Sequence, residues 1–481
     1  MTKAENNEPL YDIENPSNDS ESRVQHNRKS DAIDRLTCHL VVGYVLFALV
    51  MFCAFQLTFS LADGWHWVPI YTQNSDGAWL WEMSTPVHFV RTLFDVWFPV
   101  LLEPRLPWGE NSPIHSLIFD GIIAGVGSVV MFVPVIFFMF LVLSFLEQSG
   151  YIARVALIMD RLMRKFGLQG QSVMPMILAG GICGGCAVPA IMATRCMKHQ
   201  RERILTILIL PMMNCGAKMP VYLLLVGTFF AAWKGLIMAS LVFISWGIAL
   251  VCAKFLSRTV FCGRCSRVPM ELTAWQWPRF SKITQTAAQQ SWSFLQKAGT
   301  VILVINMLLW CLMYFPRTDA SAEMPANGPD NSERLANSYA GRIGRTLEPV
   351  SRLAGFDWRD NIALIGGFVA KEVIVSSLGT LHKVEPNAKP GSLDTHVSPK
   401  LNPKEIKSRM IGAKLASDPD WNGVKAFSMI LFVMIYAPCV ATCVVIYRET
   451  HKLRWVATAI GFNTAVAFLL AVIVYQVGST L

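Results

Sequence analysis

Three cysteines of this chain lie next to prolines inside apolar segments. Cys186 precedes a proline by three residues, Cys215 lies between two prolines, and Cys439 comes directly after one. Proline has no N–H and breaks a helix, so carbonyl oxygens near it lose their usual partners. Sulfur ligands suit Fe(II), Cu(I) or Zn(II) and do not suit alkali or alkaline-earth ions. The pattern predicts a pathway for a soft metal ion, with simple packing of the thiols as the alternative.

The segment around the first of these cysteines is rich in glycine. Residues 180–189 read Gly-Gly-Ile-Cys-Gly-Gly-Cys-Ala-Val-Pro, so Cys183 offers a second thiol in the same turn as Cys186. Glycines let the backbone turn sharply and come close to a passing ion. Met213, two residues before Cys215, adds a thioether sulfur, which is also a soft ligand. We therefore include Cys183 and Met213 among the candidate metal ligands.

Two carboxylates are further candidates. Glu372 falls in the middle of an apolar segment, directly after Lys371. A carboxylate at membrane depth is costly and indicates function, here the binding of a divalent ion or the uptake of a proton. The alternative is a structural pair with Lys371. Glu147, at the end of another apolar segment, is a candidate for ion entry or exit, or simply a solvated helix end.

Other sequence features argue against further chemistry. Cys262 and Cys265 form a single Cys-x-x-Cys, which is weak evidence for zinc without a second pair or suitably spaced histidines. The sequence contains neither the phosphate-binding loop of nucleotide hydrolases nor a dinucleotide-binding fingerprint. We therefore expect neither an enzyme nor a covalently bound cofactor.

The elements that must position these residues are transmembrane helices. Of 481 residues, 53% are hydrophobic and only 16% are charged, against about 25% in a typical soluble protein. Such a chain cannot cover a water-facing surface, so most of it must face lipid. The net charge of +9 fits Lys and Arg in cytoplasmic loops better than it fits nucleic-acid binding. The predicted fold class is an all-α polytopic membrane protein.

Apolar runs of about 20 residues, the length that crosses the hydrocarbon core, recur along the chain. The predicted spans are residues 40–61, 121–145, 204–230, 235–254, 299–316, 426–447 and 455–478. Residues 171–194 and 361–381 are apolar but interrupted, and basic residues flank the first of them on both sides. Irregular backbone survives at membrane depth only where protein buries it or where it lines a wet cavity. We expect these two segments to be broken or re-entrant helices.

The two interrupted segments belong to an internal repeat. Residues 149–154 resemble 339–345, the glycine pair 180–181 resembles 366–367, and the proline-containing run 211–215 matches 435–439. Each half contains a span, an amphipathic helix, a broken hairpin and a broken span. Three crossings between the halves would place the second copy upside down, as in many secondary transporters. In this alignment Cys186 falls opposite Glu372, and Cys215 falls opposite Cys439.

At these motifs the sequence resembles the membrane part of FeoB-type ferrous iron transporters. The matching stretches are residues 149–154, 186–195, 218–222, 297–302, 367–373, 438–442 and 448–450. The resemblance runs from about residue 34 to the C-terminus. It implies two gate modules in the membrane, with Cys186, Cys215 and Cys439 as the pore cysteines. The first hairpin departs from the usual family form, because Ala187 stands where Asn is common and Cys183 is extra.

The resemblance also implies a cargo and partners. Fe(II) would be the transported ion. The family usually carries an N-terminal GTPase domain, whereas this chain begins with a polar tail of about 36 residues. The GTPase would then be either a separate subunit or not used. A small SH3-like FeoA-type partner and a homo-oligomer are also expected, and the composition adds membrane lipid and no nucleic acid. The expected location is the cytoplasmic (inner) membrane, with several passes and a cytoplasmic N-terminus.

The predicted organisation has six parts. They are a disordered cytoplasmic tail 1–36, a first span and external loop 37–119, a first gate module 120–230, a span and basic cytoplasmic loop 231–297, a second gate module 298–447 with polar insertions 318–360 and 382–424, and a C-terminal span 448–481. Two other functions remain open. One is a gate-type transporter of nucleosides or other small solutes, and the other is a non-transporting membrane scaffold or sensor.

Overall fold

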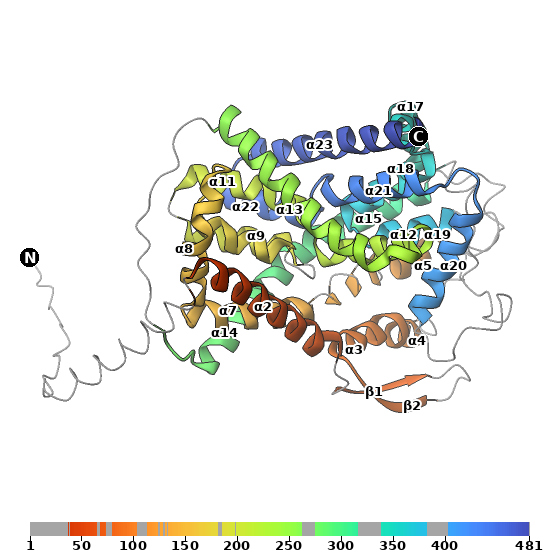
Figure 1. Cartoon of the computed structure of the whole chain (residues 1–481). Helices are drawn as coiled ribbons and strands as arrows, with labels where there is room; N and C mark the ends of the chain where they lie inside the picture. The colour runs from red at the N-terminus through yellow and green to blue at the C-terminus, as the bar shows by residue number, and fades with distance from the viewer. Residues whose placement is uncertain are drawn as a thin grey trace, which may run out of the picture.

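Helices build nearly all of the described part of the chain in its computed structural model (Figure 1). The structure describes residues 37–64, 68–73, 79–102, 113–180, 185–261, 275–315, 338–381 and 403–480, except 38, 124–125, 128–129, 132 and 198. The predicted tail, residues 318–337 and 382–402 of the predicted polar insertions, Cys183 and the Cys262–Cys265 pair lie outside the described residues.

Four helical stretches among the described residues are long and apolar enough to cross a membrane. Three are continuous helices: α2 (Leu40–Phe59), α13 (Lys234–Thr259) and α23 (Leu453–Thr480). The fourth, Gly423–Thr450, is divided into α21 (Gly423–Ile435) and α22 (Val440–Thr450). These helices confirm the predicted class, an all-α polytopic membrane protein.

A sharply bent helix pair provides a fifth candidate span. α7 (Val133–Gln148) and α8 (Tyr151–Arg164) meet at an angle of 82°. Gly150 lies between them with φ of 82°, a left-handed conformation that glycine adopts at little cost. Arg154 is buried near this bend, where its guanidinium donates to the Gly150 carbonyl at 2.8 Å. The side chain of the first charged residue of α8 therefore holds the bend in place.

The first gate module continues from α8 into a hairpin and a broken span. Its elements are η5 (Gly170–Ser172), α9 (Val173–Gly180), α10 (Ala187–Ala193), η6 (Thr194–Cys196), α11 (Gln200–Ile209), η7 (Leu210–Met212), η8 (Gly216–Lys218) and α12 (Met219–Phe229). α9 and α10 pack against each other as the two arms of the hairpin. The predicted span 204–230 is two short helices, because prolines 211 and 220 flank an interruption in the middle.

The second gate module has the same order of parts. Its elements are α17 (Tyr339–Ser351), η12 (Arg352–Ala354), α18 (Trp358–Val369), α19 (Val373–Leu381), α20 (Pro403–Ser417), α21 and α22. α18 and α19 form the hairpin, and the break between α21 and α22 contains Pro438. A capping box of Asp357 and Asp360 begins α18. The two carboxylates accept from backbone N–H groups that have no partner within the helix, and so define where this hairpin starts.

The two modules lie in opposite directions along the bundle. In Figure 1, α8, α9 and α11 gather at the left end, whereas α17, α18 and α19 gather at the right end. The contacts are reciprocal, since α10 of the first hairpin packs on α22 and α19 of the second hairpin packs on α12. Reciprocal packing of this kind is what a two-fold relation between repeats requires, so the arrangement fits the inverted repeat that the sequence predicts.

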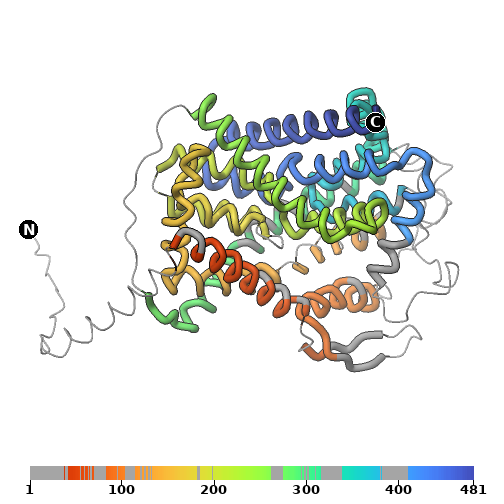
Figure 2. The backbone as a smooth tube through the Cα atoms, in the orientation of Figure 1, coloured from red at the N-terminus to blue at the C-terminus, as the bar shows by residue number. Residues whose placement is uncertain are grey.

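The remaining elements surround this core. They are η1 (Ser60–Gly64), β1 (Val68–Gln73), β2 (Trp79–Ser84), α3 (Pro86–Thr92), η2 (Leu93–Trp97), α4 (Phe98–Leu102), α5 (Pro113–Ser116), η4 (Leu117–Ile123), η9 (Ala231–Trp233), α14 (Phe280–Phe294), η10 (Leu295–Gly299) and α15 (Thr300–Tyr314). β1 and β2 form an antiparallel hairpin in the predicted external loop. Figure 2 shows α23 running along α21, its most extensive helix neighbour.

Candidate functional site

Backbone pairing brings the first two candidate cysteines together. Gly185 and Cys215 form an isolated parallel bridge, in which the Gly216 N–H donates to the Gly185 carbonyl at 2.9 Å. The Cys186 N–H in turn donates to the carbonyl of Leu178 at 2.8 Å. A Cβ at position 185 would collide with that same carbonyl, so only glycine allows the two arms of the hairpin to approach each other this closely.

The three candidate cysteines occupy equivalent local positions. Each is the N-cap residue of a helical segment, with Cys186 preceding α10, Cys215 preceding η8 and Cys439 preceding α22. All three side chains are partly buried and are free thiols. Each lies within electrostatic range of the others. The breaks of three different chain segments therefore meet in one region of the core.

The other predicted ligands have different positions. Glu372 lies in the turn between α18 and α19, partly buried and within electrostatic range of Cys186. Met213 is buried in the first broken span. Glu147 is exposed at the end of α7, where its carboxylate is near the thiol of Cys196.

The thiols do not form a ready-made metal site in this conformation. No group of three or more His, Cys, Asp or Glu side chains in the described part of the chain is close enough to hold a metal ion. A structural zinc site would need four such ligands in a tetrahedral arrangement. The candidate ligands are thus neighbours without being a coordination shell.

Lys218 is a residue of this site that sequence reasoning did not include. Its ammonium group is buried and donates to the carbonyl oxygens of Pro211 at 3.2 Å, Met213 at 2.8 Å and Met434 at 2.6 Å. The first two acceptors belong to the first broken span, and the third is near the end of α21. The sequence signal was present, since a lysine three residues after Cys215 stands in an apolar segment.

Lys371 has a similar position at the second break. Its buried ammonium group donates to the Ala437 carbonyl at 2.8 Å and lies 3.2 Å from the centroid of the Tyr436 ring. Among the described residues it forms no ion pair with a carboxylate. The suggested structural pair of Lys371 with Glu372 therefore has no support in the structure.

Neutral side chains bond to other carbonyl oxygens at the breaks. Trp246 Nε1 donates to the Gly180 carbonyl at 3.2 Å, and the Ser245 hydroxyl donates to the Met212 carbonyl at 3.1 Å. The Tyr222 hydroxyl donates to Asn214 Oδ1 at 3.1 Å. Buried carbonyl groups that helices leave unpaired need such donors. α13 therefore supplies donors to one carbonyl of the hairpin and one of the broken span, both from neutral side chains.

A group of charged side chains links the two modules at the end where α8 and α11 lie. Glu449 at the end of α22 accepts from Arg195 of η6 and from Arg203 of α11, with 2.6 Å between Arg203 Nη2 and Glu449 Oε2. The Glu449 carboxylate is only 5% exposed. This triad joins the exit of the first hairpin to the second broken span.

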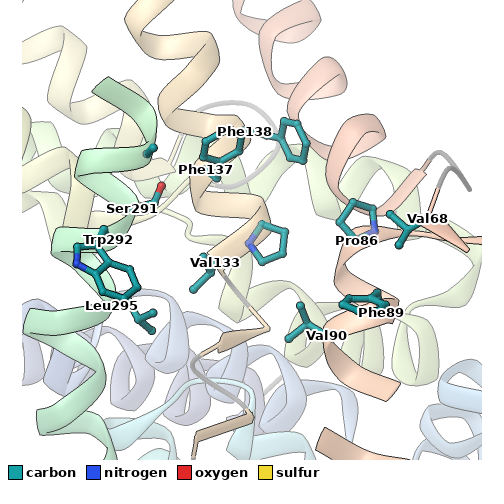
Figure 3. Close-up of a pocket in the computed structure, with 12 residues that line it drawn as sticks. Val68, Pro86, Phe89, Val90, Val133, Phe137, Phe138, Ser291, Trp292 and Leu295 are labelled. Carbon is teal, nitrogen blue, oxygen red and sulfur yellow. The ribbon is translucent and has the colours of Figure 1, made fainter. Parts of the chain in front are cut away.

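An apolar pocket lies apart from the candidate site. It has a volume of about 400 Å³ and is open on one side, and it lies between β1, α3, α7 and α14 (Figure 3). Phe89, Phe137 and Trp292 are among its lining residues, and Ser291 is its polar member. This pocket contains no sulfur or carboxylate ligand, so it offers nothing that would bind a metal ion.

Paired hairpins and broken spans in a polytopic bundle define a gate-type membrane protein, and the family comparison agrees. The Gate family, described as nucleoside recognition, matches residues 129–229 and 295–453 of this chain. These two matched segments contain the two modules described above. No solved structure is significantly similar to the chain.

Curated relatives identify the family more closely. The Fe(2+) transporter FeoB of Helicobacter pylori (strain J99) is 31% identical over 483 residues, covering 95% of this chain and 67% of the relative. FeoB of Campylobacter jejuni is 34% identical, covering 92% of this chain and 64% of the relative. The chain belongs to the FeoB family of ferrous iron transporters, as its motifs predict.

One further relative joins two proteins in one chain. The Fe(2+) transport protein A/Fe(2+) transporter FeoB fusion protein of Porphyromonas gingivalis is 31% identical, and the match covers 93% of this chain but 51% of the relative. This chain therefore spans about half of that protein and between half and two thirds of several other relatives.

Proposed function

We propose that the chain is a ferrous iron permease in which Fe(II) passes Cys186, Cys215 and Cys439. The observation that carries this proposal is the meeting of three helix-breaking segments, each with a thiol at the start of its following helix. The relatives are named Fe(2+) transporters, and sulfur ligands suit Fe(II) whereas they do not suit alkali or alkaline-earth ions. The ion is moved and not chemically altered, so the protein is not an enzyme in its own right.

The pathway supplies its ligands from several segments. Cys186 comes from the first hairpin, Cys215 from the first broken span and Cys439 from the second. Glu372 would take part as a carboxylate ligand or as a proton acceptor when the ion leaves. Met213 and Cys183 would contribute further sulfur, and Glu147 would serve at the cytoplasmic entrance or exit. Ligands spread in this way hold an ion weakly enough to release it again.

The same proposal includes the surroundings of the protein. The basic side chains of α8, η6 and α11 favour the cytoplasmic side for that end of the bundle, which would place the protein in the cytoplasmic (inner) membrane with its N-terminus inside. A FeoA-type partner is supported by the fusion protein of Porphyromonas gingivalis. We further propose a GTPase subunit and assembly into a homo-oligomer.

The test is Fe(II) entry into liposomes that contain the purified chain, under anaerobic reducing conditions, with Mn(II), Zn(II) and a nucleoside as competing cargoes. Selective entry of Fe(II), alone or after addition of a cognate GTPase, is the expected result. Entry of the nucleoside instead would replace the metal pathway with solute transport. No entry of any cargo under either condition would point to a membrane scaffold.

A further inference from the structure

Two buried ammonium groups occupy the carbonyl oxygens that the helix breaks expose. Lys218 donates to the carbonyls of Pro211, Met213 and Met434, and its side chain is 2% exposed. A carbonyl oxygen freed by a broken membrane helix is a good ligand for a cation, and transporters use such oxygens to coordinate ions. In this structure the cation at these oxygens belongs to the protein itself.

The geometry around Lys218 suits a charged ammonium group. An ammonium group carries three hydrogens, whereas a neutral amine carries only two. Three carbonyl oxygens lie between 2.6 and 3.2 Å from Lys218 Nζ, so all three hydrogens of the charged form have an acceptor. This arrangement satisfies an ammonium group completely and leaves it no donor for water.

Lys371 repeats the arrangement at the second break. It donates to the Ala437 carbonyl, directly before Pro438, and lies over the face of Tyr436. The negative face of an aromatic ring attracts a cation and offsets part of its loss of water. Lys371 and Lys218 are within electrostatic range of each other and of Cys215 and Cys439. Neither lysine forms an ion pair with a carboxylate in the described ranges.

We propose that Lys218 and Lys371 are tethered cations that close the pathway. Their ammonium groups bond to the carbonyl oxygens that a passing Fe(II) would use, and they place positive charge where the ion would have to lie. This inference rests on the proposed function. A divalent ion at the thiols would meet two ammonium groups that no carboxylate of the described residues neutralises, in a medium of low dielectric constant where repulsion is much stronger than in water. Fe(II) can bind there only after the ammonium groups move away.

The position of Lys218 also indicates what must move. Two of its acceptors lie in the first broken span, but Met434 lies on α21 in the second module, 216 residues away in sequence. Relative motion of the two broken spans would therefore separate Lys218 from at least one acceptor. Movement of the ammonium group away from its acceptors is therefore coupled to a shift between the inverted repeats, which is the motion that alternating access uses.

The experiment compares Co(II) binding in detergent, under anaerobic conditions, by the thiolate-to-cobalt charge-transfer absorbance. Lys371→Met removes the charge and keeps the length of the side chain, and Lys371→Leu removes the charge without adding a thioether that could itself bind Co(II). We expect both variants to bind Co(II) about tenfold more tightly than the unchanged protein, equivalent to about 1.4 kcal/mol. Lys371→Arg, which keeps the charge, should bind Co(II) as weakly as the unchanged protein.

The sign of the effect is decisive. If the ammonium groups instead favoured formation of thiolates, Lys371→Met would weaken Co(II) binding. Weaker or unchanged binding would therefore overturn the inference. Lys218→Met is the stronger test, but it leaves three buried carbonyl groups without a donor and loses stability. Lys371→Met leaves only the Ala437 carbonyl without its donor, so it keeps the inference testable if the Lys218 variant does not fold.

A control removes a buried lysine elsewhere. Lys425→Met combined with Asp360→Asn eliminates an ammonium group together with its partner carboxylate, at the starts of α21 and α18, away from both breaks. This double variant should bind Co(II) like the unchanged protein, and a tenfold gain in it would overturn the inference. Co(II) binding needs no transport. Failure of Fe(II) entry in liposomes would count against the proposed function, whereas an unchanged cobalt affinity would count only against the lysines.

Discussion

The guanidinium group of Arg195 binds the carboxylate of Glu449, 254 residues further along the chain. Arg195 Nε lies 2.9 Å from Oε1 and 3.0 Å from Oε2 of that carboxylate. Arg195 ends the hairpin that carries Cys186, and Glu449 ends the helix that begins at Cys439. Two thiol-bearing segments from different modules are therefore fastened to each other at one end of the bundle.

This ion pair predicts different losses of stability when each of its two partners is replaced. The Arg195 side chain is 57% exposed, so Arg195→Ala should cost only about 0.5 kcal/mol of stability. Glu449 is buried and serves Arg203 as well, so Glu449→Gln should cost about 2 kcal/mol. Thermal unfolding in detergent measures both. Equal losses in the two variants would show that the carboxylate does not hold the two modules together.

Changing single cysteines tests the pathway. Cys186→Ser, Cys215→Ser and Cys439→Ser should each lower Fe(II) entry into liposomes about tenfold or more, because a hydroxyl is a harder and weaker ligand for a ferrous ion. Cys53→Ser and Cys311→Ser are matched controls, since both thiols are exposed on the outside of α2 and α15. Full Fe(II) entry in all three pathway variants, with normal protein levels, would remove the thiols from the mechanism.

Two glycines near Cys215 should respond very differently to the same change. Gly185→Ala places a Cβ against the Leu178 carbonyl and should disrupt the bridge to Cys215, with loss of folded protein or of Fe(II) entry. Gly216→Ala meets no atom within 4 Å and should be tolerated. Size-exclusion profiles and Fe(II) entry compare them. Equal tolerance at both positions would mean that the hairpin does not need the close approach of Gly185 to the Leu178 carbonyl.

The pair of Lys425 and Asp360 predicts a double-mutant result. Lys425 Nζ lies 2.9 Å from Asp360 Oδ2, and both side chains are buried. Lys425→Met leaves a buried carboxylate without its partner and should cost about 3 kcal/mol. Adding Asp360→Asn should recover part of this loss, because the remaining group is neutral. If thermal unfolding gave additive losses, the two residues would not act as a pair.

The membrane class and the repeated modules could be predicted from the sequence, and the physical reason is local. Apolar runs show where the chain crosses lipid, and prolines and glycines show where helices break. The predicted span 204–230 already contained both prolines that divide it. The same local signals placed Cys186, Cys215 and Cys439 at the breaks, because each cysteine is within a few residues of the proline that ends regular pairing.

Only the tertiary structure decided which distant groups share a site. Lys218 was visible as a charge in an apolar segment, but its third acceptor, Met434, belongs to another module. Lys371 looked like a partner for its neighbour Glu372, yet it bonds to Ala437, 66 residues away. A buried ammonium group takes whichever carbonyl oxygens the packing presents. Those oxygens become available only when two inverted repeats bring their breaks together, and no local pattern in the sequence records that meeting.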